Sequence, residues 1–339
     1  MTIISAMFGR VRKEESGYMG MLRRLGTLGI FLVVLSLAAY SQNPAGEAEV
    51  KSNANLRSDP SSLNKPIGHL SPSDTVELLS TEPTNGYYHV RTEEGDEGWV
   101  WGKALTILTA ETLDAAIVAT SGAPSDSISA DWEKPAPNRV TFNGSEGSCP
   151  WKGSGFDSDQ YELKNRTDVP AAYHDVTWDA VRNLPYPVAP AWRKNWSAEQ
   201  LAKIKPYEGE ALRVVGYLVA IKPQNKSSGT GEGTNCKFIR AADTDIHLAL
   251  AAQAGGPEND SVVVEFTPRF TQKHPKWTKA KLGPWLNADK PVRVSGWLML
   301  DPDHRNHLHK YRGTLWEIHP ITTFEVFQSG VFVDLDHVP

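Results

Sequence analysis

Short stretches in which apolar and polar residues alternate, separated by turns, fill two parts of the chain. In the first part, Val76 and Leu78 fall on one face of an extended segment, and Tyr88 and Val90 do the same in a later one. Alternation with a period of two is typical of strands that bury one face and expose the other. The pattern predicts a small antiparallel β domain over residues 46–107.

The second part, residues 207–330, contains longer apolar segments. Residues 212–221 and 292–300 share the pattern Val-x-Gly-aromatic-Leu. Between them the pattern predicts three shorter strands and a helix, and two more strands follow the second long segment. In chain order, these elements are expected at 236–240, 245–250, 261–266, 276–286 (the helix), 315–319 and 322–327.

This order, in which strands are followed by a helix and then by further strands, is that of an OB-like barrel. In such a barrel the first and fourth strands are neighbours, and glycine is expected where strands bend strongly. Gly216 and Gly296 are predicted to occupy such bends. A different small β-barrel or a β-sandwich is the alternative that this strand order leaves open.

Two segments with other patterns connect the two parts. Residues 108–146 are rich in Ala, Ser, Pro, Asp and Thr and are predicted to be a flexible linker. Residues 147–206 are predicted to be a helical lead-in to the second barrel, in which Ser197 and Gln200 have the spacing of a capping box.

The first part also carries a series of short motifs. In chain order they are Asn55-Leu56-Arg57-Ser58-Asp59-Pro60, Ile67-Gly68-His69-Leu70, Gly86-Tyr87-Tyr88-His89-Val90 and Gly98-Trp99-Val100. Their order and spacing resemble the bacterial SH3-like family, and the resemblance covers residues 46–107. The predicted fold class is therefore mainly β: an SH3-like small barrel and a C-terminal OB-like β-barrel with a short helical lead-in.

The resemblance implies a module that binds and that brings no catalytic residue with it. Relatives of this kind often attach to cell-wall peptides or to protein partners, so a wall peptide or an envelope protein is the expected partner. Leu56, Tyr88 and Trp99 are expected in the core of the small barrel. Three further side chains are candidates for contact with a ligand: Arg57, Tyr87 and Trp101.

The N-terminal segment predicts export. Arg23 and Arg24 precede an uncharged apolar run, residues 26–39, which is followed by a site suited to cleavage after Ser41. The run is shorter than the roughly 20 residues that cross a membrane, and it is typical of a secretory signal. We expect a signal peptide over residues 1–41 and an exported mature protein, periplasmic or extracellular, without a membrane span. The alternative is an uncleaved segment that anchors the protein in the membrane.

Removal of this segment makes the chain more acidic. The full sequence has 35 basic and 40 acidic residues, and residues 1–41 contain five basic and two acidic ones, which gives the mature chain a net charge of −8. A chain this acidic is not expected to bind nucleic acids in general.

The sequence contains two cysteines, Cys149 and Cys236. In an oxidising compartment they are expected to form a disulfide. The alternative is two separate buried thiols, because neither residue has the flanking pattern of a catalytic nucleophile or of a Cys-x-x-Cys metal site.

Two loops of the second barrel are candidate binding sites. OB-like barrels usually bind ligands on the face of strands two and three and at the loops that join strands one to two and four to five. Here these loops are residues 222–235 and 301–313. The second loop is basic, and we expect Arg305, Lys310 and Arg312 to bind an anionic ligand such as a wall polymer.

The same loop also offers ligands for a metal ion. A divalent metal is the one cofactor that the sequence suggests, since carboxylate and imidazole groups gather there. A solvated loop of mixed charge is the alternative. The candidate metal ligands are Asp303, His304, His307 and His309.

Alternation places further polar residues in two rows. Asp243, Asp245 and His247 fall on one face of a strand, and Glu317 and His319 fall together on another strand. If the third and fifth strands pair, the rows approach each other, where they could bind a divalent cation or act as a general acid and base. Charge pairing across strands on a solvent-exposed face explains the same pattern without a ligand.

Signatures of enzymes are absent from the sequence. There is no Gly-x-Ser-x-Gly motif, and residues 229–233 lack the Lys-Ser/Thr of a phosphate-binding loop. The predicted function is that of an exported adaptor of the cell envelope with two binding barrels, and catalysis is not expected. Two alternatives stay open: a metal-dependent hydrolase, such as a phosphodiesterase or nuclease, on the second barrel, and an envelope scaffold that recognises only protein.

Overall fold

The computed structural model describes residues 46–72, 74–108, 128–155 and 157–339. The predicted signal peptide and the first half of the predicted linker lie outside the described residues. Among the residues that are described, no helix is both long and apolar enough to cross a membrane.

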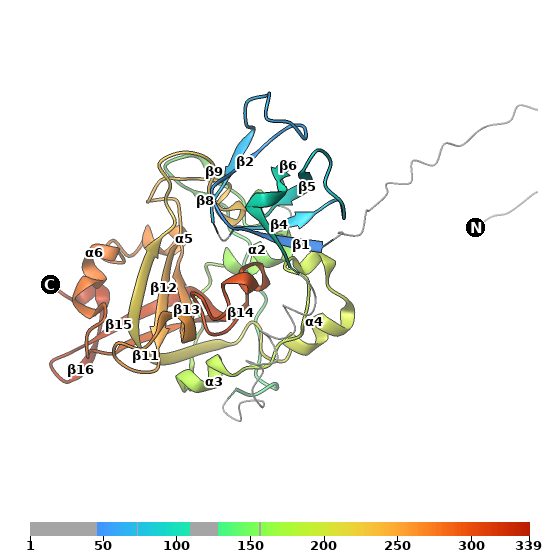
Figure 1. Cartoon of the computed structure of the whole chain (residues 1–339). Helices are drawn as coiled ribbons and strands as arrows, with labels where there is room; N and C mark the ends of the chain where they lie inside the picture. The colour runs from blue at the N-terminus through green and yellow to red at the C-terminus, as the bar shows by residue number, and fades with distance from the viewer. Residues whose placement is uncertain (1–45, 73, 109–127, 156) are drawn as a thin grey trace, which may run out of the picture. The chain divides into compact units, whose positions relative to one another are not determined.

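The first module folds as a small β-barrel (Figure 1). Its main sheet is antiparallel with the strand order β6-β5-β4-β1-β7, and β2 and β3 form a separate pair. The predicted alternation holds, because Val76, Leu78 and Val90 are buried together in one core. The strands are β1 Gly46–Val50, β2 Ala54–Leu56, β3 Gly68–Leu70, β4 Thr75–Leu78, β5 Tyr87–Thr92, β6 Glu97–Trp101 and β7 Leu105–Leu108, with the 3-10 turn η1 Gly102–Ala104.

The lead-in contains short helices joined by turns. Helix α4 begins at the predicted capping box of Ser197 and Gln200. Ile128 and Trp132 contact the core of the second barrel, so residues from the second half of the predicted linker are part of the folded region. The last residues of the predicted linker contain β8 Phe142–Asn143. The elements of the lead-in are β9 Ser148–Cys149, α2 Ser158–Lys164, β10 His174–Val176, α3 Trp178–Arg182, η2 Arg193–Asn195 and α4 Ala198–Ile204.

The C-terminal part is a closed five-stranded barrel with the order β11-β12-β13-β15-β14, in which β14 pairs again with β11. Strands β13 and β15 are parallel, and α5 and α6 lie between β13 and β14 along the chain. This is the predicted OB-like order, with the first and fourth strands as neighbours. The elements are β11 Ala211–Pro223, η3 Gly233–Asn235, β12 Ile246–Ala251, η4 Glu258–Asp260, β13 Val262–Phe266, α5 Pro268–Thr271, α6 Lys279–Leu282, η5 Gly283–Trp285, β14 Val292–Leu300, η6 Pro302–His307, β15 Trp316–Gln328, β16 Val331–Asp334 and η7 Leu335–His337.

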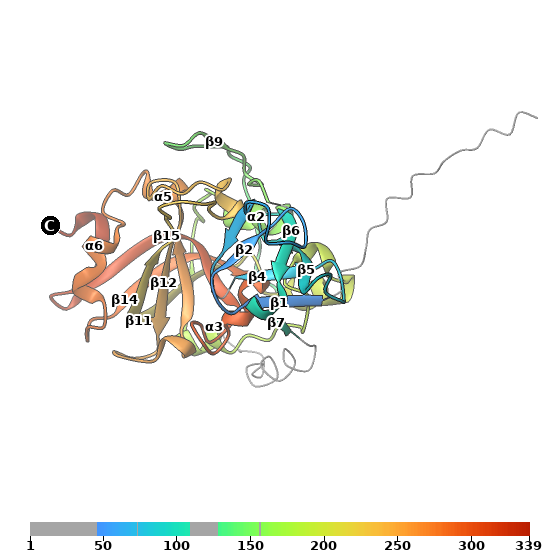
Figure 2. The ribbon, with the colours of Figure 1, turned by 45° about the horizontal axis from the view of Figure 1, so that its top comes forward.

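Two short strands and the C-terminus extend this barrel. Strand β10 adds to β11 in parallel, and β16 pairs with β15. Figure 2 shows α6 beside the C-terminal end of the chain, where Lys281 Nζ donates a hydrogen bond to the carbonyl oxygen of Pro339 at 2.8 Å.

The strand boundaries differ from the prediction in two places. Residues 236–240 do not form a strand, because Cys236 and Lys237 have left-handed backbone conformations with φ of 56° and 65°. His247 therefore lies on the second strand of the barrel and not on the third. The two predicted C-terminal segments belong to one long strand, β15.

Gly296 lies where the pairing of β14 with β15 shifts register. A Cβ atom at this position would lie 2.4 Å from the carbonyl oxygen of Pro320. The close approach of the two strands therefore requires glycine, in agreement with the predicted bend.

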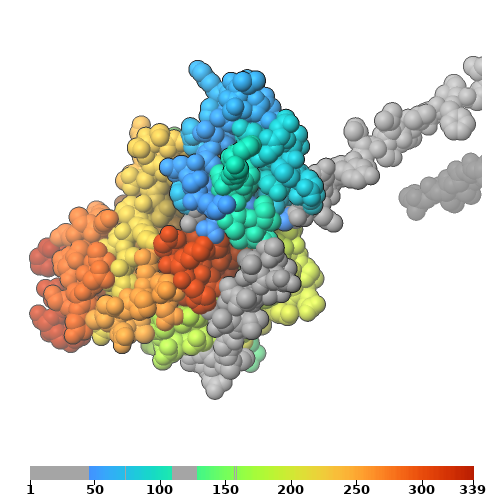
Figure 3. Space-filling view, viewed as in Figure 1, coloured from blue at the N-terminus to red at the C-terminus, as the bar shows by residue number. Residues whose placement is uncertain are grey.

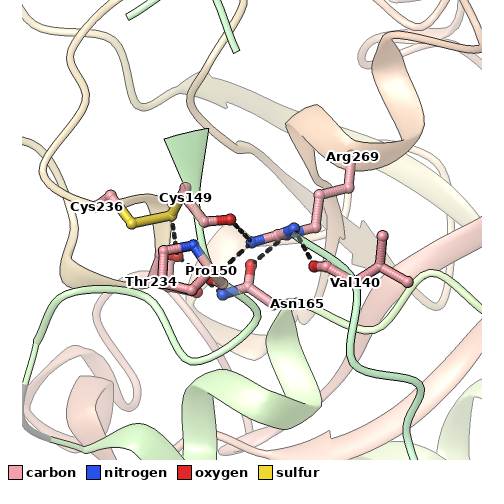
Figure 4. The surroundings of a disulfide bond; sticks show 7 residues. All are labelled: Val140, Cys149, Pro150, Asn165, Thr234, Cys236 and Arg269. Atoms are coloured by element: carbon pink, nitrogen blue, oxygen red, sulfur yellow. Dashed lines mark hydrogen bonds between the residues drawn. A yellow bond between two sulfur atoms is a disulfide. The ribbon is translucent and has the colours of Figure 1, made fainter. Parts of the chain in front are cut away.

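A disulfide joins the lead-in to the barrel, as we predicted from the presence of two cysteines. Cys149 in β9 is bonded to Cys236 after η3 across 87 residues of chain. Arg269 is buried beside the bond (Figure 4). Its Nε donates to Oδ1 of Asn165 at 2.8 Å, and the amide of Asn165 donates to the carbonyl oxygen of Thr234 at 2.9 Å. These contacts fix the loop between β11 and β12 against the lead-in.

Ion pairs connect the first module to the rest of the described chain. Glu47 of β1 pairs with Arg305 and accepts a hydrogen bond from the backbone nitrogen of Ala191 at 2.8 Å. Lys310 pairs with Glu49 at 2.7 Å. In Figure 3 the red-orange surface of the segment after β14 borders the blue-green surface of the module, in line with the contact between β4 and η6. The described residues accordingly belong to one compact unit.

Candidate functional site

One face of the β5–β6 hairpin carries two pairs of aromatic rings. The strand register places Tyr87 opposite Trp101 and His89 opposite Trp99. The ring centroids lie 4.9 Å apart in the first pair and 4.8 Å apart in the second. Because Trp101 is 41% exposed, this aromatic face (Tyr87, His89, Trp99 and Trp101) is accessible to a ligand.

The position of Trp99 corrects the prediction that placed it in the core. Side chains alternate along β6, and the buried positions belong to Gly98 and Val100. Trp99 is half-buried and stacks on His89, on the opposite side of the strand.

The other predicted residues of this module lie near that face or in the core. Leu56 is buried in the core and Tyr88 packs against it, as predicted. Arg57 forms a β-bridge with Trp99, and its guanidinium donates a hydrogen bond to the carbonyl oxygen of Asn64 at 2.6 Å. Arg57 therefore adjoins the aromatic face, and its role in binding stays a prediction.

A cavity of about 290 Å³ lies on the β12–β13 face of the OB-like barrel. His247 and Glu265 line it from the strands, His304 and Arg312 from the segment after β14, and Asp74 from the first module. This is the face at which OB-like barrels usually bind ligands. A second cavity of about 290 Å³ shares Asp74, His304 and His307 with it and is also lined by Glu93 and Glu232.

Two histidines flank one buried carboxylate in the wall of the first cavity. Oε2 of Glu265 lies 3.2 Å from Nε2 of His247 and 2.9 Å from Nδ1 of His319. The topology produces this arrangement, because His247 of β12 lies opposite Glu265 of β13, and β13 pairs with β15, which carries Glu317 and His319.

The charges in this group shift one another's pKa. Burial alone would raise the pKa of Glu265, but His247 and His319 outweigh burial and hold this pKa well below its usual range. Burial would lower the pKa of His319, but Glu265 and Glu317 raise it to about 10. Val264, Phe266 and Ile318 alternate with these residues and fill the barrel core, so the buried group of Glu265 and His319 lies on the outer face of the sheet.

The two predicted rows of polar residues meet through β13. Glu317 and His319 are buried, so the solvent-exposed face that the sequence offered as an alternative is not what the structure shows. Asp245 is 1% exposed, and its Oδ1 has no hydrogen-bond partner among the described residues. Asp243 does not join the group, because its carboxylate accepts hydrogen bonds from the backbone nitrogen and the hydroxyl of Ser145 at 2.8 and 2.6 Å.

Asp301 organises a neighbouring set of buried charges that sequence reasoning missed. Its carboxylate accepts hydrogen bonds from Nζ of Lys164 at 3.0 Å and Nε2 of Gln160 at 2.9 Å, and it bonds Nδ1 of His304 at 2.8 Å. Although burial raises the pKa of Asp301, Lys164 and His304 hold it well below its usual range. Burial lowers the pKa of His304, but Asp301 raises it to about 9.

The segment 301–313 is less exposed than the sequence suggested, and the role of its cations in binding an anion stays a prediction. Arg305 is engaged with Glu47, and Arg312 donates to Glu317 at 2.6 Å, with both arginines buried. Lys310 is the most exposed of the three predicted cations, with 48% of its side chain accessible. Buried carboxylates on neighbouring strands account for the difference.

Asp303, His304 and His307 line the second cavity, and the ring centroids of His304 and His307 lie 5.1 Å apart. Together with His309, however, these residues form no group of three ligand atoms within 4.8 Å of one another. Asp303 is buried and accepts a hydrogen bond from Gln160 at 3.2 Å, and the ring of His304 is hydrogen-bonded to Asp301. His309 is exposed and has a left-handed backbone conformation with a φ of 60°. Within the described part of the chain, ligand atoms come within 4.8 Å of one another in two other groups. These groups are Glu232, Asp245 and His247, and Asp245, Glu265 and His319.

Residues 52–106 match the family model of the bacterial SH3 domain. The first module is a bacterial SH3 domain. An SH3 domain of this family and a disulfide together fit an exported protein. No curated protein matches the chain.

Two solved structures share a limited similarity with the chain: NlpC2 and NlpC1 from Trichomonas vaginalis. Each is 18% identical to this chain over 23% of its length, with a TM-score of 0.17. The matches cover 32% and 31% of those chains, so this chain spans less than a third of their length. A likeness of this size carries no argument about function.

Proposed function

We propose that the protein is an exported binding protein of the cell envelope, and that its SH3 domain attaches it to cell-wall peptide. The observation that carries this proposal is the aromatic face of an SH3 domain whose relatives usually bind peptidoglycan. Aromatic rings bury a large area against a peptide and keep polar edges for hydrogen bonds. The cross-strand pairing of Tyr87 with Trp101 also holds both rings in place before a ligand binds.

The OB-like barrel is the second binding surface in this proposal. An anionic polymer as its ligand has less support than the sequence suggested, since Arg305 and Arg312 are engaged with buried carboxylates. Lys222 lines the cavity and pairs with Glu258, and the more exposed Lys310 pairs with Glu49. The proposed attachment to the wall therefore rests on the SH3 domain.

Retention of the purified protein on cell-wall sacculi tests the proposal. We expect Trp101→Ala and Tyr87→Ala each to weaken retention about tenfold, because truncating a central aromatic side chain of an interface typically costs more than about 1 kcal/mol. The measurement is the fraction of protein that sediments with increasing amounts of sacculi.

Ile107→Ala is the matched control. Ile107 is 40% exposed on β7, which lies at the opposite edge of the sheet from β6, so its removal should leave retention unchanged. Failure of the wild-type protein to sediment with sacculi would reject wall binding. Retention of a folded Trp101→Ala variant at the wild-type level would reject the aromatic face as the binding surface.

A further inference from the structure

We propose that the OB-like barrel binds one divalent transition-metal ion of the Zn²⁺ class in the wall of its cavity. The site lies between β12, β13, β15 and the loop after β11, and it is independent of wall binding by the SH3 domain. Two imidazoles and three carboxylates form the ligand set: Glu232, Asp245, His247, Glu265 and His319.

Each of two overlapping groups places three ligand atoms close enough to share one ion. The two groups that bring ligand atoms within 4.8 Å of one another share Asp245. Nitrogen and oxygen ligands lie about 2.0–2.2 Å from Zn²⁺, so ligand atoms on opposite sides of the ion are separated by up to about 4 Å. Small side-chain rotations therefore bring either group to bonding distance.

The backbone around the site is held firmly. His247, Glu265 and His319 come from three neighbouring strands of one closed sheet. Glu232 lies in the β11–β12 loop, four residues before the disulfide-bonded Cys236. A set of ligands on paired strands loses little conformational freedom when an ion binds.

Buried polar atoms without partners point to a missing ligand. Oδ1 of Asp245 and Nε2 of His319 both lack a hydrogen-bond partner among the described residues, and each residue is only 1% exposed. Buried polar atoms in proteins are nearly always hydrogen-bonded or bound to metal. A metal ion in the site would supply a partner for the carboxylate of Asp245.

The permanent cations of the wider network are engaged elsewhere. Lys164 pairs with Asp301 at 3.0 Å, and Arg312 pairs with Glu317 at 2.6 Å. The pair of Arg312 with Glu317 has a second role, because Glu317 also contacts Nδ1 of His319 at 3.2 Å. Such outer contacts orient the imidazole of a metal ligand.

The chemistry of the donors selects the class of metal. Ca²⁺ and Mg²⁺ prefer sites made of oxygen atoms alone, whereas imidazole together with carboxylate suits Zn²⁺ and its neighbours in the first transition series. Because His247 and Glu265 line one cavity and Glu232 lines the other, an ion can reach the site from solvent.

Calorimetric titration with Zn²⁺ tests the proposal, using protein purified without a histidine tag. We expect one equivalent of Zn²⁺ per chain, also found by elemental analysis after dialysis. We expect Asp245→Ala and His247→Gln each to weaken binding by a factor of about 100 or more, since loss of even an outer-shell partner costs 10–100-fold.

His274→Gln is the matched control, because His274 pairs with Asp336 at 2.5 Å in the same part of the chain but belongs to neither group of ligands. The affinity of the His274→Gln variant for Zn²⁺ should equal that of the wild type. Absence of binding by the wild type overturns the proposal. The proposal is also overturned if Asp245→Ala binds Zn²⁺ with wild-type affinity while the double variant His304→Gln/His307→Gln does not bind it. The ion would then lie in the segment after β14.

A measurement on the wild type alone avoids the risk that a buried substitution prevents folding. Co²⁺ in place of Zn²⁺ gives visible absorption bands whose energy and intensity report imidazole and carboxylate ligands. We expect bands of a protein-bound ion that saturate at one equivalent. A spectrum that stays that of the aqueous ion contradicts the proposed site.

Discussion

Replacing both Cys149 and Cys236 with alanine is expected to lower the free energy of unfolding by about 4–5 kcal/mol, the chain-entropy value for a long closed loop. The disulfide closes a loop of 87 residues and ties the lead-in to the barrel. Alanine is chosen because Cys149 is only 1% exposed and a serine hydroxyl there would need a partner. Urea unfolding of the variant and of the oxidised wild type measures the difference.

The reduced wild type supplies the control for this experiment. Reduction should lower the stability of the wild type to that of the double variant and should leave the variant unchanged. If oxidised and reduced wild type unfold at the same urea concentration, the bond does not stabilise the fold, and the fixed position of the β11–β12 loop must come from the contacts of Arg269 and Asn165 alone.

The order of strands could be predicted from the sequence, because alternation and glycine positions are local properties of the chain. The predicted pairing of the first and fourth strands is confirmed by the register of β11 with β14. The strand prediction was wrong where the local sequence pattern favours a strand but the backbone adopts another conformation. Residues 236–240 have the composition of a strand, yet the disulfide-linked turn at Cys236 gives them left-handed conformations that end any strand.

The candidate metal site was only partly predictable. Asp245, His247 and His319 were placed on polar rows, but Glu265, which joins them, was assigned to an apolar strand and overlooked. A single carboxylate in an otherwise apolar strand was the available signal. Lys164 gave no such signal, because its pairing with Asp301 spans 137 residues and depends on the tertiary fold.

The sequence also shows where charges are, but it does not show which charges pair. Arg305, Lys310 and Arg312 look alike in a basic segment, and only the structure separates them. Arg305 and Arg312 are buried against glutamates, whereas the side chain of Lys310 is 48% exposed and pairs with Glu49. Removing one partner of a buried ion pair lowers the free energy of unfolding more than removing one partner of an exposed pair does.

Arg305→Met is expected to lower the free energy of unfolding by about 3–5 kcal/mol, because it leaves Glu47 as a buried charge without its partner. The side chains of Arg305 and Glu47 are 5% and 8% exposed. Lys310→Met is the matched control: it removes a cation that also pairs with β1 but is 48% exposed, and it should change stability by about 1 kcal/mol or less. Urea unfolding measures both variants.

The double variant Glu47→Leu/Arg305→Met decides what the pair does. Replacing both partners of a buried pair with apolar residues is often neutral or stabilising by about 1–4 kcal/mol, so most of the loss should be recovered. Recovery would show that Arg305 serves to neutralise Glu47 between the SH3 domain and the segment after β14. If Arg305→Met instead kept full stability, Arg305 would be free to bind a ligand, as its sequence context predicted, and the contact between the two barrels would depend on other residues.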